Sequence, residues 1–308
     1  MIDQFFLARY PGDGSEQIKV REFLRWLCTQ HIKLGLADPN FESNLCGGDE
    51  PRYWQRLSEA LLAYELLDAG LDVRPSRNGP DFLVMHDGRK IWVEVICPEP
   101  LGIPEEWLSF EPNLVVSGVP FPDKAILLRW TAAIKEKAEK LLGNSESPAS
   151  GYLKRGVVGP DDSYVIAING RRLRGKNSAL MGISGYPFAV EAVFEVGPYQ
   201  LEIDPTSLKI TDAAHQLRPC IAKPKGCSVP AYTFLDPAFR AVSAIWATDI
   251  NDCWVLGNDK PMAVVHNPIA INPIPQQFLP ATWEYVPVPS GKDKCRLDKR
   301  QGRLSITA

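Results

Sequence analysis

The stretch of sequence that decides the fold runs from residue 79 to residue 96 and reads GPDFLVMHDGRKIWVEVI. Both of its halves, residues 81–85 and residues 90–96, are rich in strand-forming side chains. Between them lies Asp87-Gly88, a pair that favours the tight turn of a β-hairpin. Pro98 follows closely and ends the second strand, because proline has no backbone N–H to donate. The stretch therefore predicts an antiparallel hairpin.

Helical patterns surround this hairpin, with apolar residues three or four positions apart. Gly70 suits the C-terminal cap of the helix that precedes the hairpin. The further elements that we expect are helices at 17–36, 52–69 and 124–142 and a strand at 164–168. Residues 101–121 carry several prolines and look irregular. The order is helix, hairpin, helix, strand.

This order predicts an α/β fold with a mixed sheet flanked by helices and a β-leaning C-terminal extension. We expect a helical segment at 1–50, a core at 51–175 and an extension at 176–308 that packs on the same sheet. Within the extension, short strands are predicted at 190–196, 242–246, 253–256 and 262–266.

Net charge, apolar runs and cysteine spacing limit the classes of protein to which the chain can belong. The chain has 308 residues and a net charge of −3, so it lacks the overall basic charge typical of many nucleic-acid-binding proteins. No apolar run approaches the roughly 20 residues of a membrane span. The seven cysteines form no CxxC pair, so neither a structural zinc site nor a disulfide framework is indicated. We expect a cytoplasmic protein with no membrane partner.

Two acidic residues stand at informative places in the hairpin. Asp81 opens the first strand, and Glu94 lies near the end of the second, amid apolar residues where an unpaired charge would be costly. A short hairpin brings these positions side by side. Close carboxylates repel each other unless a cation lies between them. Oxygen ligands of this kind suit Mg²⁺ or Mn²⁺.

A helix, then Gly79-Pro80-Asp81, then a strand ending in Trp92-Val93-Glu94-Val95, then a helix and a strand, resembles the PD-(D/E)XK nuclease superfamily. The resemblance covers about 120 of the 308 residues. It implies a restriction-endonuclease-like fold and hydrolysis of nucleic-acid phosphodiesters, DNA more than RNA, with genome defence as a setting. It also implies that Asp81 and Glu94 bind the divalent ion.

The chain departs from the family at the lysine that should follow the glutamate by two positions, because that position is Ile96. Some family members supply the lysine from a neighbouring element, and the helix after the hairpin is the expected source. At about 100° per residue, Lys137 falls at the edge of the apolar stripe, whereas Lys135 points further round. We therefore predict Lys137 as the catalytic lysine; the alternative is that both lysines belong to a solvated face.

Several other residues are weaker candidates. The basic cluster Arg171, Arg172, Arg174 and Lys176 could bind phosphates, although such runs are often merely solvated. Glu59, Glu65 or Gln55 on the helix before the hairpin could supply a further ligand, but Glu59 lies opposite the apolar stripe and is expected at the surface.

Two further side chains are interpreted as structural. His266 follows a predicted strand, and Cys97 has no neighbouring cation in the sequence that would activate it. The motifs of P-loop ATPases, Rossmann oxidoreductases, zincins and α/β-hydrolases are absent.

Two alternatives to a nuclease remain open. The missing lysine is also compatible with a fold that has lost catalysis and acts as a binding or scaffolding module. In the other alternative, an unrelated α/β protein pairs Glu94 with a buried arginine such as Arg129.

Overall fold

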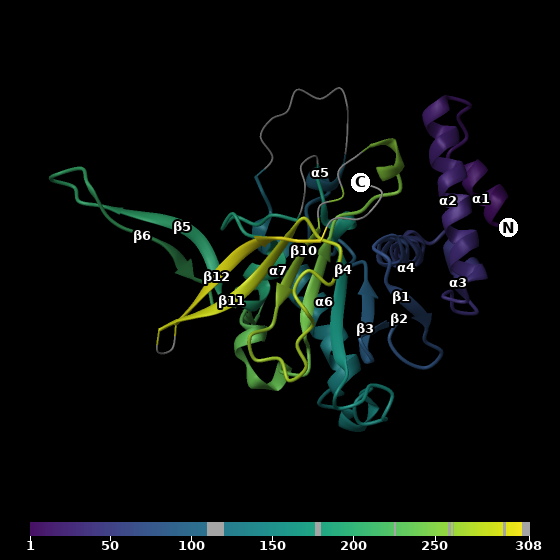
Figure 1. The fold of residues 1–308 in the computed structure, drawn as a ribbon. Helices are drawn as coiled ribbons and strands as arrows, with labels where there is room; N and C mark the ends of the chain where they lie inside the picture. The colour runs from purple at the N-terminus through teal and green to yellow at the C-terminus, as the bar shows by residue number, and fades with distance from the viewer. Residues whose placement is uncertain are drawn as a thin grey trace.

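A mixed eight-stranded sheet with helices on both faces forms the body of the molecule (Figure 1). The computed structural model describes residues 1–109, 120–175, 180–224, 226–257, 260, 262–291 and 294–303. The α/β class with a mixed sheet flanked by helices, predicted from the sequence, is confirmed.

The helices are α1 (Ile2–Arg9), α2 (Ser15–Lys33), α3 (Phe41–Cys46), α4 (Glu50–Asp68), α5 (Glu105–Leu108), α6 (Asp123–Leu142) and α7 (Phe188–Val193). Short 3-10 turns lie at η1 (Pro148–Ser150), η2 (Gly170–Leu173), η3 (Thr233–Leu235), η4 (Pro237–Phe239) and η5 (Trp254–Leu256).

The sheet follows the order β1-β2-β3-β4-β9-β10-β11-β12. Its strands are β1 (Asp72–Pro75), β2 (Phe82–His86), β3 (Arg89–Ile96), β4 (Ser163–Asn169), β9 (Ala244–Thr248), β10 (Met262–His266), β11 (Trp283–Gly291) and β12 (Lys294–Gln301). Strands β3, β4 and β9 run parallel, so their carboxyl ends meet at one edge. Two small separate ribbons consist of β5 (Val196–Ile203) with β6 (Ile210–Leu217) and of β7 (Cys220–Ile221) with β8 (Val229–Pro230).

The predicted hairpin is formed by β2 and β3. Their antiparallel register pairs Phe82 with Val93 and His86 with Arg89. The two turn residues, Asp87 and Gly88, have φ angles of 48° and 77°. Positive φ at both positions is the conformation that Asp-Gly favours in two-residue hairpin turns.

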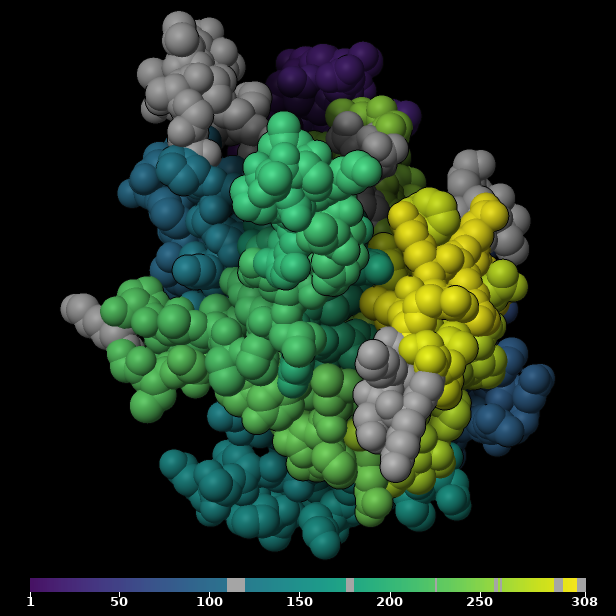
Figure 2. Space-filling view, turned by 90° about the vertical axis from the view of Figure 1, so that its left-hand side faces the viewer, coloured from purple at the N-terminus to yellow at the C-terminus, as the bar shows by residue number. Residues whose placement is uncertain are grey.

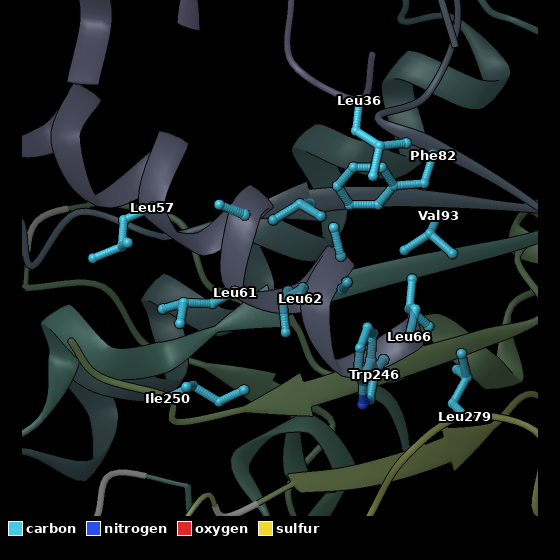
Figure 3. Close-up of a cluster of buried hydrophobic side chains, with 14 of the residues drawn as sticks. Leu36, Leu57, Leu61, Leu62, Leu66, Phe82, Val93, Trp246, Ile250 and Leu279 are labelled. Carbon is cyan, nitrogen blue, oxygen red and sulfur yellow. The ribbon is translucent and has the colours of Figure 1, made fainter. Parts of the chain in front are cut away.

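One face of the sheet packs against α4, with α2 behind it. The apolar stripe of α4 meets inward side chains of β2, β3 and β9, as Figure 3 shows for Leu62, Leu66, Val93 and Trp246. The stripe arises because leucine and alanine recur at helical spacing along α4.

The other face packs against α6 and α7. Trp130 of α6 is fully buried there together with Tyr164 and Ile166 of β4. With helices on both faces, β4 is buried over its whole length, which explains why its sequence is apolar from Tyr164 to Ile168 rather than alternating.

Two sequence-based predictions of local structure are wrong. Residues 188–193 form α7 rather than a strand beginning at 190, and all six of its side chains are buried; periodicity cannot distinguish a strand from a helix in such an apolar run. Residues 254–256 form a 3-10 turn rather than a strand. The N-terminal helix α1 and edge strand β1 were not anticipated. By contrast, the strand at 262–266 is confirmed.

No helix in the described ranges has the length and apolar character needed to cross a membrane.

The carboxyl ends of β4 and β9 are tied to α4 through one side chain. The amide nitrogen of Asn169 donates to Ser58 Oγ and to the Ile250 carbonyl, each at 3.0 Å. Its oxygen accepts hydrogen bonds from the Ile250 N–H at 3.1 Å and the Arg171 N–H at 3.3 Å. Because Asn169 is completely buried, nothing in solvent can replace these bonds.

Replacing Asn169 with alanine should therefore lower the free energy of unfolding by about 2–3 kcal/mol, since several buried polar groups lose their partners. Urea denaturation followed by circular dichroism measures this change. Asn78→Ala, at an exposed asparagine before β2, is the control and should change stability by about 0.5 kcal/mol or less. Equal denaturation midpoints for wild type and Asn169→Ala would contradict this role.

Candidate functional site

The candidate site lies at a notch in the sheet, because β2 begins only at Phe82 and leaves the last residues of β3 without a strand partner on that side. The last β2–β3 pair joins Phe82 to Val93, whereas β3 continues to Ile96 alongside β4. Pro80 lies two residues before Phe82, and proline has no N–H with which to continue the ladder along β3. Beyond Val93, the backbone N–H and C=O groups on this edge of β3 must therefore find hydrogen-bond partners among side chains.

Asp81 fills the first place in this notch. Its carboxylate accepts a hydrogen bond of 2.6 Å from the backbone N–H of Val95. Continuing the register by one residue places Asp81 opposite Glu94. Residues directly opposite each other in an antiparallel pair have Cβ atoms about 4.5–5.5 Å apart on the same face, and the Glu94 charge is near enough to raise the pKa of Asp81.

Glu94 is held by two lysines from α6. Its Oε1 atom accepts hydrogen bonds from Lys137 Nζ at 3.0 Å and from Lys140 Nζ at 2.7 Å. Glu94 is 2% exposed and Lys137 is 5% exposed. The predicted position of Lys137 beside the sheet is confirmed, and the solvated-face alternative is wrong for this lysine. Lys135 does point outward, toward Glu139 on the same helix.

The backbone of α6 is fixed at this point by β4. Tyr164 is fully buried, and its hydroxyl donates a 3.0 Å hydrogen bond to the carbonyl of Lys137. Strand β4, the neighbour of β3, thus fixes the position of α6 along the sheet at the residue from which the Lys137 side chain extends. Lys140 lies one turn further on and reaches the same carboxylate oxygen.

Helix α4 completes the notch from the opposite face of the sheet. Gln55 donates to the Val95 carbonyl at 3.1 Å and accepts from the Cys97 N–H at 3.0 Å, as a paired strand would. It also donates to Glu59 at 3.0 Å, and Arg56 forms an ion pair with Glu59 at 2.8 Å. The expectation that Glu59 is a surface residue is wrong, because it is 5% exposed.

The three carboxylates influence one another. Burial raises the pKa of Asp81 well above its usual value, and repulsion by Glu94 and by Glu59 raises it further. Burial also raises the pKa of Glu59, against the attraction of Arg56. Burial lowers the pKa of Lys140, but attraction to Glu94 outweighs this effect and leaves the pKa above its usual value.

These acids can serve as ligands of a divalent cation. Among the residues that the structure describes, no three His, Cys, Asp or Glu side chains are grouped as a preformed metal cage. Mg²⁺ does not require one, because it commonly binds one or two carboxylates and keeps several waters. The mutual repulsion that raises the pKa of Asp81 is the kind that a bound cation relieves. Asp81 and Glu94 therefore fit such an ion.

A polar hollow of about 570 Å³ adjoins the notch. Gln55 and Arg56 belong both to the notch and to the wall of the hollow. The remaining lining residues are Asn44, Pro51, Arg52, Ile96, Cys97, Pro98, Glu99, Arg129 and Glu136. The whole wall contains three arginines, Arg52, Arg56 and Arg129. Their planar guanidinium groups match the geometry of a phosphate.

The basic cluster after β4 lies beside this hollow. Burial raises the pKa of the Cys97 thiol to about 11, while the nearby charges of Arg172 and Arg171 act to lower it. The Arg171 guanidinium lies 6.0 Å from the ring centroid of Trp54 on α4. Arg174 points elsewhere and pairs with buried Asp249 at 3.5 Å. Lys176 lies outside the described residues.

Other candidates from the sequence stand apart from the notch. His266 is buried, with its Nε2 atom 3.6 Å from Glu284 Oε2, in keeping with a structural histidine at a strand end. Glu65 pairs with Lys260 at 2.8 Å. Arg129 donates from Nε to the Glu99 carbonyl at 2.7 Å rather than to Glu94. The proposed Glu94–Arg129 pair is therefore wrong, because the lysines of α6 hold Glu94.

The part of the site that sequence analysis missed comes from helix surfaces. In the sequence, Lys140 is marked only by its spacing of three residues from Lys137, and nothing marks Arg52 or Arg56 as part of a site.

No protein-family model, curated protein or solved structure matches the chain.

Burial and the neighbouring acids make the ionised carboxylate of Asp81 lower the free energy of unfolding. Because the pKa of folded Asp81 lies above its ordinary value of 3.8, ionisation destabilises the protein as pH rises past that value. In metal-free buffer, Asp81→Asn should raise the free energy of unfolding at pH 8 by about 1–2 kcal/mol, and the gain should vanish near pH 4. Asparagine keeps the acceptor for the Val95 N–H.

Urea denaturation across this pH range measures the effect. Asp161→Asn, at an exposed position, is the matched control and should leave stability nearly unchanged at every pH. An Asp81→Asn variant that is less stable than wild type at pH 8 would show that the carboxylate supports the fold instead.

Proposed function

We propose that this protein is a divalent-metal-dependent nuclease that hydrolyses nucleic-acid phosphodiesters, DNA more than RNA. The observation that carries the proposal is the buried Lys137, which α6 delivers to Glu94 at 3.0 Å, next to Asp81. Two acids and a lysine at one strand end form the set that phosphodiester cleavage requires, and here the lysine comes from a helix instead of from β3.

Asp81 and Glu94 would hold Mg²⁺ or Mn²⁺, with the backbone and water supplying further oxygen ligands. When bound, the ion would lower the pKa of a coordinated water and neutralise charge on the phosphate. Glu59 lies close enough to raise the pKa of Asp81 and is the third acid available to the site. Its pairing with Arg56 positions it without leaving a buried charge unpaired.

Lys137 is suited to stabilise the negative charge that develops on the phosphate. It is buried, so its ammonium acts where water screens charge weakly. Lys140 is 44% exposed on its side chain, so its ammonium can turn to solvent more readily than that of Lys137, which is 6% exposed. With Lys140 withdrawn, one position on Glu94 becomes free for a cation while Lys137 remains.

The hollow beside the notch supports a nucleic-acid substrate. Arg52, Arg56 and Arg129 line it, and Arg171 and Arg172 lie next to it near Cys97. A local basic patch of this kind can bind a phosphate backbone even though the net charge of the chain is −3. It lies at the carboxyl ends of β3 and β4, where open α/β sheets commonly bind ligands.

A second candidate function is an inactive nuclease fold that binds or scaffolds. The observation that favours it is the double lysine pairing of Glu94, which already neutralises one of the two proposed metal ligands. Such a module would bind nucleic acid without cutting it and would show no Mn²⁺ affinity that depends on Asp81.

Incubation of plasmid, single-stranded DNA and RNA with the protein and Mn²⁺ or Mg²⁺ tests the proposal. Wild type should cut plasmid, and Asp81→Asn should lower the rate by about 100-fold or more, because the ion loses a ligand. Absence of cutting on every substrate with either ion would overturn the nuclease proposal in favour of the binding module.

The role of the lysine has its own test on the same helix. Lys137→Met should lower the cutting rate by about 100-fold, in the range seen when one electrostatic group is removed from an active site. Lys135→Met, at an exposed lysine two residues earlier, should cut at the wild-type rate. Equal rates for both variants would exclude Lys137 from the chemistry, and circular dichroism establishes that each variant is folded.

A further inference from the structure

Strands β5 and β6 form a two-stranded antiparallel ribbon, residues 196–217, that belongs to neither face of the main sheet. We call this ribbon the arm. In Figure 1 it extends away from the body, beyond β11 and β12. Figure 2 views the molecule from the side on which the arm projects, and the atoms of the arm stand in front of the body.

The arm has one apolar face. Its register places Tyr199 opposite His215, Leu201 opposite Ala213 and Ile203 opposite Ile210. Alternate residues of a strand share a face, and so do residues directly opposite each other, so these side chains lie together. The register shift between Glu202 and Ile203 is what brings Ile210 onto this face. The large apolar members of the face are 51% to 81% exposed, namely Tyr199, Leu201, Ile203, Ile210 and Leu217.

The opposite face of the arm is polar and acidic. Gln216 donates to Gln200 across the ribbon at 2.6 Å, and Glu202 stands opposite Asp212. The arm is therefore amphipathic, like a sheet that packs one face on a core, but within the part of the chain that the structure describes no second layer covers its apolar side.

The base of the arm is anchored on the body. The ring of His215 lies 5.1 Å from that of Tyr186 and 5.0 Å from that of Tyr199. Tyr186 in turn contacts Tyr285 of β11. The arm is thus held at its base and presents the rest of its apolar face outward.

A two-stranded ribbon is at best marginally stable in water by itself. Contiguous apolar patches larger than a few hundred Å² are rare on monomers and mark interaction sites. With roughly 100 Å² of exposed surface for each large side chain, the arm offers on the order of 500 Å². This is a large part of the about 800 Å² that each partner contributes to a standard protein interface.

We propose that the apolar face of the arm is covered by the same face of a second copy of this chain, so that the protein forms a two-fold symmetric dimer. A two-fold interface requires a patch that complements itself, and between Tyr199 and Ile203 this face carries no charge to repel its own copy. Nucleic acid is disfavoured as the occupant, because Glu202 and Asp212 on the other face repel phosphates.

Sedimentation velocity from about 1 to about 100 µM protein tests the dimer. Wild type should sediment with twice the chain mass of 34.2 kDa. Leu201→Glu places a charge within the apolar face and should weaken self-association by about 100-fold or more. Gln200→Glu adds the same charge at the neighbouring residue on the opposite face and should leave the dimer intact.

A wild-type protein that sediments as a monomer at every concentration would overturn the proposal. Equal dissociation of the two variants, or a Leu201→Glu protein that stays dimeric, would also overturn it. Far-UV circular dichroism spectra should be the same for the two variants and show that both are folded, since both substitutions lie outside the main sheet. These outcomes do not depend on whether the protein cuts nucleic acid.

Discussion

Glu94 lies in the buried interior of β3, where an unpaired carboxylate would cost the fold several kcal/mol. This constraint determines what may stand around it. Helix α6 must bring cations to the strand, and it supplies Lys137 and Lys140. Tyr164 bonds the backbone of α6 at Lys137, so the neighbouring strand keeps the helix in the register that the ion pair requires. Stability alone does not call for this arrangement, because an apolar residue at position 94 would avoid the cost.

Because β2 starts only at Phe82, the end of β3 beside Glu94 has no strand partner on that side, and other groups can approach it. Beyond Val93, the free edge of β3 is completed by Asp81 and by Gln55 instead of by a strand. Polar side chains therefore converge from the hairpin and from α4 at a place where a regular sheet would have only backbone. The hollow lined by arginines opens next to them. Fold and proposed chemistry thus share one cause, a β2 strand whose pairing with β3 stops at Val93 while β3 continues to Ile96.

Local signals predicted the hairpin and its turn, the helices on either side and the position of Lys137, because period and turn chemistry depend on near neighbours. Lys137 could be predicted since it borders the apolar stripe of its own helix. Glu59 could not, because its burial comes from the end of β3 and from Arg56 rather than from its place on the helical wheel. The helix at 188–193 could not be predicted from periodicity, because all six of its side chains are buried and no polar face marks the period. The arm was not foreseen, because alternation in a sequence does not show whether an apolar strand face is covered or exposed.

The most direct test of the central claim is the position of a metal ion in a crystal grown or soaked with Mn²⁺, located by its anomalous scattering. The site that we describe predicts a peak between the carboxylates of Asp81 and Glu94, about 2.2 Å from an oxygen of each, with Lys140 displaced and Lys137 retained. A crystal with no peak there, in which both lysines still hold Glu94, would contradict the claim that these acids form a metal site.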